Sequence, residues 1–316
     1  MEENRCLILG GCGFLGSAVT RQLVESGWKV RVFDKEGTDT WRLQSVISSV
    51  ELVMGDFLNV AELGKVLEGV ETVIHFIGTT IPQSSMEDVN YDIETNVLPT
   101  LRMLDLLKSA GVKRLLFASS GGTVYGPVDE EKPIPETHQT NPIVAYGISK
   151  LMIEKHIQMF SLVNDIPAVI LRIANPFGEA QLATRAQGAV AVFMGKIRQG
   201  ETIHIWGDGS IVRDYIYVED VAAAFKAVLV TREVNGIFNI GTGKGTRLDV
   251  LAEAIGRLFS REVRVSLDPA RVYDVPYNVL DISKISRATD WKPKYSLESG
   301  LEKMKSSYTH ISTGTR

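Results

Sequence analysis

A tyrosine and a lysine stand four residues apart in the segment Tyr146-Gly147-Ile148-Ser149-Lys150, where a helical pattern begins. On a helix, this spacing places both side chains on one face. A phenol is a poor base at neutral pH because its pKa is about 10, and a neighbouring ammonium lowers that pKa by favouring the phenolate. The pair is therefore a candidate acid–base catalyst that takes a proton from a hydroxyl group. The spacing alone is common, so its meaning depends on the elements around it.

Three glycines, Gly10, Gly13 and Gly16, separate the apolar run Cys6–Leu9 from an amphipathic helix. A side chain at the first two would block the tight turn or the approach of a pyrophosphate, and one at the third would hold the helix off the strand. The helix N-terminus offers N–H groups and a positive dipole end to phosphates. The turn therefore predicts a dinucleotide site.

Asp34 ends the second predicted strand. An acid about 20 residues beyond the glycines accepts hydrogen bonds from a ribose 2′-OH and repels a 2′-phosphate, so NAD is the predicted cofactor rather than NADP. Asp56 follows the third strand. It has two interpretations, a contact to the adenine amino group or the N-cap of the following helix. The alternative for the whole region is a Rossmann domain that binds no cofactor.

The elements that must position these residues alternate between short apolar strands and amphipathic helices. This order predicts the α/β class, with a Rossmann-type doubly wound parallel sheet covered by helices on both faces. The predicted strands are Cys6–Leu9, Val30–Phe33, Val50–Met54, Val73–Phe76, Arg114–Ala118 and Ala168–Arg172, and the predicted helices are Leu15–Ser26, Val60–Glu68, Ile93–Ala110 and Ala145–Asn164.

The alternating pattern ends after Arg172, and a smaller α/β substrate-binding lobe is predicted there. Residues 1–175 form the predicted NAD-binding domain, with parts of 210–240 returning to it. The lobe takes 176–209 and 241–304, and 305–316 form a polar, disordered tail. The helices predicted after Arg172 are Ala189–Gln199 and Leu248–Ser260. The strands predicted there are Thr202–Ile205, Gly236–Ile240 and Arg264–Leu267.

The composition is that of a globular protein: 44% of the 316 residues are hydrophobic and 23% are charged. A net charge of −4 and scattered basic residues disfavour nucleic acid and anionic membranes as partners. The two cysteines, Cys6 and Cys12, fit a reducing compartment, and Cys12 is interpreted as a small filler in the glycine turn. No apolar run is long enough to span a membrane and no signal peptide is recognised, so a cytoplasmic location is predicted.

Metal binding is not predicted, because the five histidines form no cluster with metal-ligand spacing. His75 lies in an apolar strand and is interpreted as a satisfied core residue.

Several of these motifs occur together in one family. The sequence resembles the extended short-chain dehydrogenase/reductases, and within them the NAD-dependent nucleotide-sugar epimerases, most of all the UDP-glucose and UDP-N-acetylglucosamine 4-epimerases. The resemblance covers almost the whole chain. It rests on Gly10–Gly16, Asp34, Ser119–Gly126, the Tyr146/Lys150 pair, Leu171–Pro176 and Trp206–Gly209 through Arg213–Tyr215.

The resemblance implies a mechanism. Tyr146 would deprotonate the 4-OH of a UDP-hexose while C4 passes a hydride to tightly bound NAD, and the 4-keto sugar would turn over and take the hydride back on its other face. The alternatives are a nucleotide-sugar reductase or another epimerase on the same scaffold, and a non-catalytic NAD-sensing protein. Such sensors tend to lose the Tyr or the Lys, and this chain keeps both.

A hydroxyl in the segment Ser119–Tyr125 normally assists the proton transfer in this family. Counted from the preceding strand it falls on Ser120, and counted back from Tyr125 it falls on Gly121, so one residue is inserted here. Ser120 is favoured, with Thr123 as second partner, and a purely structural turn is the alternative. Related dehydratases and decarboxylases carry acids at the positions of Gly122 and Thr123, which disfavours both reactions.

The resemblance also implies contacts to the nucleotide sugar. Asn175 and Arg213 would contact the diphosphate, Arg271 a phosphate and Asp274 the uridine ribose; the alternative for each arginine is a surface ion pair. Asn278 falls beside the sugar C2 substituent, where its small size would admit an N-acetyl group, and Thr80 replaces a lysine of some relatives. Further candidates are Phe14, Leu15, Lys35, Phe57, Phe76, Ile77, Gly78, Thr95 and Ser119 for the cofactor, and Gln187 and His204 for the substrate.

A homodimer is a further implication, formed by packing Ile93–Ala110 and Ala145–Asn164 of two copies into a four-helix bundle. Apolar residues on more than one face of these helices agree with it, and burial within the monomer is the alternative. These residues are Leu101, Leu104, Leu107, Met152, Ile153, Ile157 and Phe160.

Overall fold

The computed structural model describes residues 5–181 and 188–313. Its main sheet has seven strands in the order β10-β6-β5-β4-β1-β2-β3, and every neighbouring pair is parallel. This is the predicted doubly wound Rossmann topology. The strands are β1 (Arg5–Leu9), β2 (Lys29–Asp34), β3 (Val50–Met54), β4 (Thr72–His75), β5 (Arg114–Ser120), β6 (Ala168–Ile173) and β10 (Gly236–Ile240).

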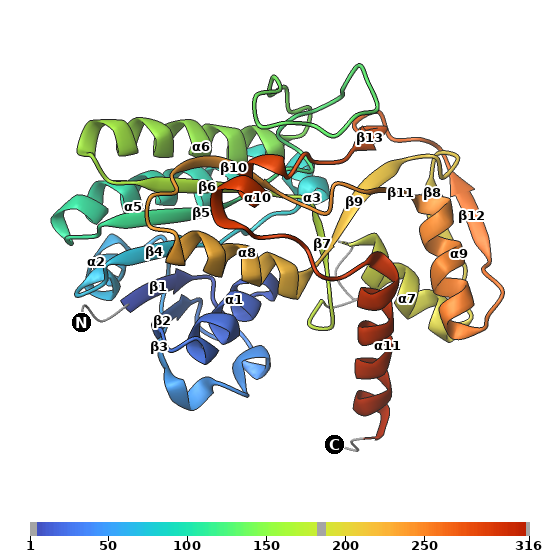
Figure 1. Ribbon diagram of the computed structural model, residues 1–316, viewed down its shortest axis with the longest axis horizontal. Helices are drawn as coiled ribbons and strands as arrows, with labels where there is room; N and C mark the ends of the chain where they lie inside the picture. The colour runs from blue at the N-terminus through green and yellow to red at the C-terminus, as the bar shows by residue number, and fades with distance from the viewer. Residues whose placement is uncertain (1–4, 182–187, 314–316) are drawn as a thin grey trace.

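Helices cover both faces of this sheet (Figure 1). One face packs against α1 (Phe14–Glu25) and α8 (Val218–Val230), and the other against α2 (Val60–Leu67), α5 (Leu98–Ser109) and α6 (Ala145–Asn164). Cys6 and Ile8 of β1 enter the first core, whereas Leu7 and Leu9 enter the second. Because both faces are buried, the strand is continuously apolar instead of alternating.

The strand order reverses between β1 and β4, which lie side by side although β2 and β3 come between them in sequence. In open α/β sheets, ligands bind at the carboxyl ends of the strands at such a switch point. The glycine turn follows β1 and the segment Phe76–Thr80 follows β4. The two segments therefore meet at the expected ligand-binding edge.

A smaller set of strands and helices lies beside this sheet (Figure 1). Strand β9 (Val212–Tyr217) pairs with β7 (Asn175–Phe177), β11 (Gly245–Arg247) and β13 (Tyr277–Asn278), and β8 (Ile203–Trp206) pairs with β12 (Val265–Asp268). A third core cluster joins α7 (Ala189–Gln199), α9 (Leu248–Phe259) and α11 (Leu297–Thr313). Leu280, Ile285 of α10 (Ser283–Thr289) and Trp291 pack in the core of the main sheet instead. The domain boundaries therefore stay a prediction.

The predicted helix Ile93–Ala110 is divided in the structure. Helix α4 (Val89–Asp92) leads into a π-helical turn, Ile93–Val97, and α5 begins at Leu98. Pro99 has no N–H to donate to a carbonyl one turn earlier, which disturbs the regular α-helical ladder at this point. α3 (Pro82–Glu87) precedes these turns, and two short 3₁₀ helices, Trp41–Leu43 and Ile47–Ser49, follow β2.

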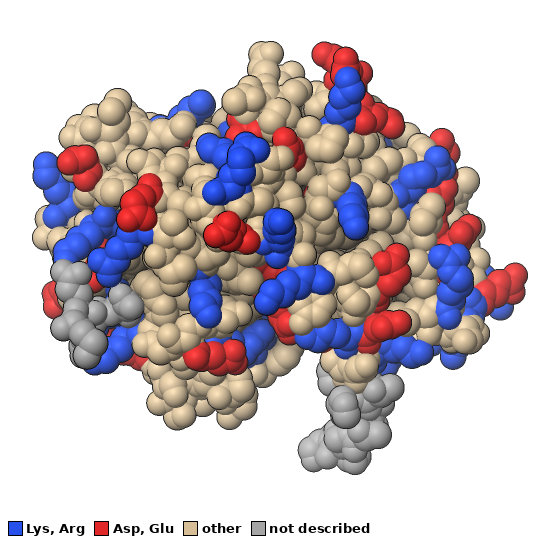
Figure 2. Space-filling model, viewed as in Figure 1, with Lys and Arg blue, Asp and Glu red and all other residues tan. Residues whose placement is uncertain are grey.

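The predicted disorder of the polar tail is wrong for its first residues, because α11 continues through Lys305 to Thr313. Met304 is fully buried and the Lys305 ammonium donates to the carbonyl of Leu258, so packing against α9 holds this polar stretch in a helix. Within the described ranges, no helix is long and apolar enough to cross a membrane. Acidic and basic side chains are interspersed over the face seen in Figure 2.

Candidate active site

The glycine turn between β1 and α1 leaves no room for side chains at Gly10 and Gly16. A Cβ on Gly16 would lie 2.2 Å from the carbonyl oxygen of Gly10, and one on Gly10 would lie 3.0 Å from the backbone nitrogen of Ile77. Gly10 also has φ of +81°, which L side chains rarely adopt. No side chain caps the N-terminus of α1 at Gly13. Phe14 and Leu15 are the first residues of this helix. Because no side chain occupies its N–H groups, the turn fits the pyrophosphate of a dinucleotide.

Asp34 lies at the end of β2, next to this turn. Its carboxylate accepts from the backbone N–H of Cys12 at 2.8 Å and from that of Lys35 at 2.9 Å. These bonds fix the carboxylate beside the glycine turn, the position required for a contact to the ribose hydroxyls of NAD. Burial, with the adjacent Asp34, raises the pKa of the Cys12 thiol to about 12, so Cys12 stays protonated as a filler should.

Asp56 does not cap α2. The N-cap is Asn59, whose side chain accepts from the N–H groups of Ala61 and Glu62, and Asp56 instead accepts from the N–H of Leu58 at 2.9 Å. The N-cap interpretation of Asp56 is therefore wrong, and the adenine contact stays a prediction. The neighbouring Phe57 ring is buried 5.2 Å from the His75 ring, so this side chain belongs to the core.

The segment Phe76–Thr80 is held by the helical turns that follow it. The N–H of Thr79 donates to Asn96 at 2.9 Å, and the hydroxyls of Thr79 and Thr95 are hydrogen-bonded. Phe76 packs on Phe225 with ring centroids 4.7 Å apart, while Gly78 is exposed. Ile77 and Gly78 therefore lie on a fixed loop at the cofactor edge.

The Tyr146/Lys150 pair stands in the first turns of α6, as the spacing predicts. The N–H of Tyr146 donates to the hydroxyl of Ser85 in α3 at 3.0 Å, which satisfies one free donor of the helix start. The Lys150 ammonium lies 5.7 Å from the centre of the Tyr146 ring and donates to the carbonyl of Ala118 at 3.0 Å. The two side chains share one face, next to the end of β5.

The charges of this pair differ from the expectation. Burial, reinforced by the negative charge of Asp92, raises the pKa of Tyr146 to about 12. Burial lowers the pKa of Lys150 to about 8, against the opposing effect of Asp92 and then Glu154. The expected lowering of the Tyr146 pKa by Lys150 is therefore absent in the protein alone, because burial dominates and the ammonium donates to Ala118.

The end of β5 brings two hydroxyl candidates to α6. A Cβ on Gly147 would lie 3.1 Å from the Cβ of Thr123, so Thr123 lies against the residue that follows Tyr146. The Thr123 hydroxyl is buried and has no hydrogen-bond partner among the described residues. Ser120 is half-buried at the end of the strand. Ser119 is different, because its hydroxyl donates to the buried Glu154 and so faces the interior.

The arginine candidates converge in the smaller lobe. Arg271 forms an ion pair with Asp274 at 2.9 Å, and its guanidinium lies 4.2 Å from the centre of the Trp206 ring. Burial lowers the pKa of Arg213, while the charges of Asp274 and Arg271 act on it in opposite directions. Segments around residues 206, 213 and 271 thus form one cationic site, which suits a diphosphate.

Four other substrate candidates are already hydrogen-bonded. The side chain of Asn175 donates to the carbonyl of Asp214 at 3.2 Å, and that of Asn278 donates to the carbonyl of Gly121 at 2.9 Å while its Oδ1 lacks a partner in the described ranges. Thr80 donates to Asp92, and His204 lies 3.1 Å from Asp268 on the β8–β12 ribbon. Gln187 lies outside the described residues.

Sequence reasoning missed the buried carboxylates of the site, among them Asp92 and Asp214. Asp214 accepts from the N–H groups of Thr242 and Gly243, which fixes the turn after β10; its place between Arg213 and Tyr215 was a usable signal. Asp92 accepts from Thr80 and Ser149, and no sequence motif pointed to it. Both carboxyl groups join separate segments of the site through hydrogen bonds.

His75 is a core residue, with one ring nitrogen 3.0 Å from Thr100 Oγ1 and the other without a partner in the described part. Burial, with the nearby Lys150, lowers its pKa to about 3, so the ring is neutral. In the described ranges, no cluster of His, Cys, Asp and Glu could hold a metal ion.

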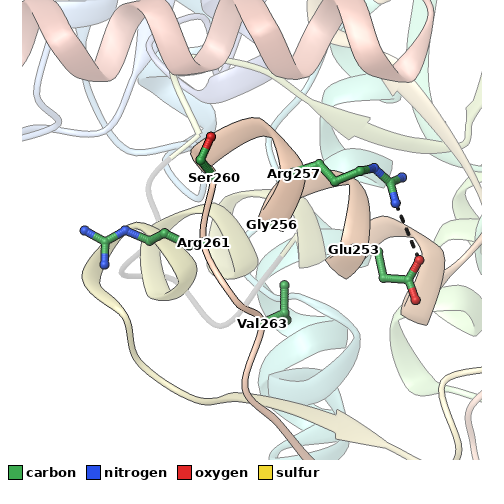
Figure 3. A pocket seen from close by; sticks show the side chains of 6 residues that line it. All are labelled: Glu253, Gly256, Arg257, Ser260, Arg261 and Val263. Carbon is green, nitrogen blue, oxygen red and sulfur yellow. Dashed lines mark ion pairs between the residues drawn. The ribbon is translucent and has the colours of Figure 1, made fainter.

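A hollow on α9 of the smaller lobe holds none of the candidate residues (Figure 3). Glu253, Gly256, Arg257, Ser260, Arg261 and Val263 line it. This hollow is therefore not part of the candidate active site, whose Tyr146/Lys150 pair lies next to the end of β5.

Comparisons with known proteins identify the family of this chain. The model of the NAD dependent epimerase/dehydratase family matches residues 6–241, which span both the glycine turn and the Tyr146/Lys150 pair. The chain belongs to this family. Its cofactor is accordingly NAD, and the glycine cradle and Asp34 fit that dinucleotide.

Three similar proteins illustrate the range of the NAD-dependent epimerase/dehydratase family. A putative UDP-glucose 4-epimerase of Methanocaldococcus jannaschii is 32% identical over 94% of this chain and 96% of its own. A dTDP-4-dehydro-6-deoxyglucose reductase of Escherichia coli is 30% identical over 96% and 97%. The structure of Thermotoga maritima UDP-glucose 4-epimerase with UDP-glucose has a TM-score of 0.90 and 31% identity, covering 97% and 99%.

Proposed function

We propose that this protein is an NAD-dependent epimerase that inverts C4 of a UDP-hexose through a transient 4-keto intermediate. The observation that carries this proposal is the pairing of Tyr146 and Lys150 with an unpartnered hydroxyl, that of Thr123, beside them. An enzyme that eliminates water from the sugar needs a carboxyl group in this position, and the chain has Gly122 and Thr123 there. A proton relay without an added acid suits a reversible oxidation at a carbinol carbon.

In the proposed mechanism, one group of residues transfers the proton and another group binds the nucleotide sugar. Tyr146 accepts the proton of the sugar 4-OH and returns it, with Thr123 or Ser120 hydrogen-bonded to the same oxygen. Lys150 keeps a positive charge next to the tyrosine. Bound NAD supplies the hydride acceptor and donor and, when oxidised, a further positive charge that favours the phenolate. Arg213 and Arg271 hold the diphosphate, so that the sugar can turn while the nucleotide stays bound.

A reductase is the second candidate, because a reductase is among the similar proteins. A reductase exchanges its cofactor in each turnover, whereas an epimerase keeps NAD and regenerates it. Asp34, fixed by the backbone at 2.8 Å from Cys12, disfavours the 2′-phosphate of NADPH.

The decisive experiment offers UDP-glucose, UDP-galactose, their N-acetyl forms and UDP-glucuronate to the purified protein without added cofactor. We expect interconversion at C4, followed by NMR. The N-acetyl pair is included because Asn278 is small. If no sugar interconverts while NADPH is consumed with a 4-keto sugar, the protein is a reductase and the proposal is wrong.

We also propose that the protein forms a homodimer through α5 and α6. The monomer buries five of the apolar residues on which this expectation was based, namely Leu104, Leu107, Ile153, Ile157 and Phe160. Support comes instead from a row of exposed apolar side chains along α6: Ile148, Met152, Met159, Leu162 and Val163. Leu162 is 86% exposed, which is costly in water unless another surface covers it.

Sedimentation equilibrium tests the dimer. Leu162→Glu places a charge in the exposed apolar row of α6, at its most exposed position, and should give monomers at micromolar concentration. The matched control Val272→Glu changes a 99% exposed residue outside α6 and should leave the dimer intact. A wild-type protein that sediments as a monomer would overturn the proposal. The two free cysteines, Cys6 and Cys12, support a cytoplasmic location for this enzyme.

A further inference from the structure

Asp92 is a buried carboxylate in an irregular part of the chain. It ends the short helix α4, directly before the π-helical turn Ile93–Val97, and it is 1% exposed. Burial of an ionised carboxylate is costly unless hydrogen bonds or charges compensate for it. π-helical turns are rare and frequently occur at functional sites. The position of Asp92 therefore requires a physical account.

The carboxylate joins three segments of the site. Oδ1 accepts from the hydroxyl of Thr80, in the loop after β4, and from Asn96 Nδ2 at 3.1 Å. Oδ2 accepts from the hydroxyl of Ser149, the residue before Lys150 in α6. All three partners donate to this carboxylate, so its oxygens are satisfied although it is buried. Asp92 thus links the cofactor loop to the turn of α6 that carries Tyr146 and Lys150.

A second buried carboxylate near Lys150 is neutralised. Glu154, one helical turn beyond Lys150, forms an ion pair with Arg172 at 2.6 Å, and both side chains are at most 2% exposed. The partners of Asp92 in its hydrogen bonds are neutral side chains. Of the two carboxylates that act on Lys150, Asp92 is therefore the one whose negative charge is left to balance the buried ammonium.

We propose that Asp92 is a positioning residue of the active site, which anchors the catalytic turn of α6 through Ser149 and serves as the counter-charge of Lys150. This inference deepens the proposed function and rests on Tyr146 and Lys150 being its catalytic pair. It assigns to Asp92 a role in catalysis without contact to the substrate.

The electrostatics of the pair agree with this geometry. Among the described residues, the charged and titratable groups that face Lys150 are Asp92 from α4, Tyr146 and Glu154 from α6, Arg172 from β6, which pairs with Glu154, and the neutral His75 from β4. Burial lowers the pKa of Lys150 to about 8, and Asp92 is the larger of the two influences that raise it. Loss of the Asp92 charge should therefore lower this pKa further, and Lys150 would lose its proton at a lower pH.

The test is Asp92→Asn, which keeps the shape of the side chain and removes its charge. We expect kcat to fall about 10- to 100-fold with KM nearly unchanged, as for a displaced catalytic group. The alkaline limb of the kcat–pH profile should move to lower pH by about one unit. Asp92→Glu restores the charge in a shifted position, so it should keep the alkaline limb of the wild type while kcat stays reduced.

A second measurement does not depend on turnover. NMR of the full-length protein labelled with ¹³Cε-lysine should show one lysine that titrates at about pH 8 and is lost in Lys150→Met. In Asp92→Asn this titration should move to lower pH, by about one unit. The matched control is Asp88→Asn at the exposed N-cap of α4, where asparagine caps a helix as well as aspartate does, so kcat and the lysine titration should stay unchanged.

The outcomes separate the two proposals. If the wild-type protein turns over no sugar but the lysine titration shifts in Asp92→Asn, the counter-charge role of Asp92 is supported and the proposal of an epimerase is overturned. An unmoved titration in folded Asp92→Asn overturns the counter-charge, whatever happens to kcat. If Asp92→Asn does not fold, Ser149→Ala removes one anchor without touching the charge. It should lower kcat several-fold at constant KM, and wild-type kcat in that variant would overturn the positioning role.

Discussion

The catalytic half of the site and its substrate half hold charges in different ways. Around Tyr146, the charged side chains of Lys150, Glu154 and Asp92 are at most 8% exposed, and fixed partners engage each of them. Around Arg271, the ion pair with Asp274 is 29% and 17% exposed, and the guanidinium lies on aromatic rings. Buried, fully bonded charges resist rearrangement, whereas half-exposed ones can exchange their partner for a ligand.

This difference separates two kinds of change in kinetics. A substitution in the catalytic half should alter kcat or the stability of the protein. A substitution in the substrate half should alter KM, because it removes binding that the ground state and the transition state share.

The largest effect is expected for Tyr146→Phe. The change removes the proton acceptor and nothing else, so kcat should fall about 1,000-fold, within the range found for general acid–base groups. KM and the amount of bound NAD should stay close to those of the wild type. Rates are measured by NMR at C4, and NAD by its absorbance after release.

The control for this variant is Tyr295→Phe, which removes a hydroxyl that donates to Glu219 at 2.7 Å beside α11. It should leave kcat within about twofold of wild type. A Tyr146→Phe protein with nearly full activity would remove Tyr146 from the mechanism.

The second effect is on stability, in Glu154→Gln. The substitution leaves Arg172 buried at 2% exposure without a charged partner. Breaking a buried ion pair costs about 3–5 kcal/mol because the remaining charge stays desolvated. We expect a much lower urea midpoint, measured by circular dichroism. A midpoint equal to that of the wild type would show that the pair is not held as the structure places it.

The third prediction is a lower affinity for the substrate in Arg271→Ala. Loss of a charged hydrogen bond to a phosphate costs about 1.5–3 kcal/mol, which corresponds to a KM raised about 10- to 100-fold. The value of kcat should change less than about threefold. Arg271→Lys keeps the charge without the planar fork and should be intermediate. A fall in kcat at constant KM would contradict the division between the two halves.

The sequence was most informative where single short segments build the site. The glycine turn, Asp34 and the Tyr146/Lys150 pair each lie within one strand, turn or helix start, and the strand, turn and helix that the sequence predicts for them are present in the structure. Periodicity also predicted the first six strands of the main sheet, because a buried parallel strand leaves a continuously apolar run.

Features that depend on distant contacts were not predictable. Strands β7, β11 and β13 are two or three residues long and exist through pairing with β9, so no periodicity could mark them. Helix α8 follows directly on β9. It was not predicted, because no element was assigned from the sequence between the segment Arg213–Tyr215 and the strand Gly236–Ile240. The hydrogen-bond network of Asp92 joins residues 80, 92, 96 and 149, and no local pattern connects these positions. The pKa of Tyr146 was predicted in the wrong direction because burial cannot be read from a four-residue spacing.

The smallest effect is expected for Glu253→Gln, the counterpart of Glu154→Gln on the surface. Glu253 and Arg257 stand at i and i+4 on α9, 3.6 Å apart, with side chains 70% and 69% exposed (Figure 3). Water screens such a pair and both side chains lose freedom in forming it, so it contributes only about 0.3–0.5 kcal/mol. The urea midpoint should move barely beyond error, and less still in 1 M salt. Because glutamine and glutamate have similar helix propensity, the two substitutions differ mainly in burial. Equal losses in both variants would mean that burial does not govern the strength of ion pairs in this protein, and the contrast between its dry catalytic half and its open substrate half would fail.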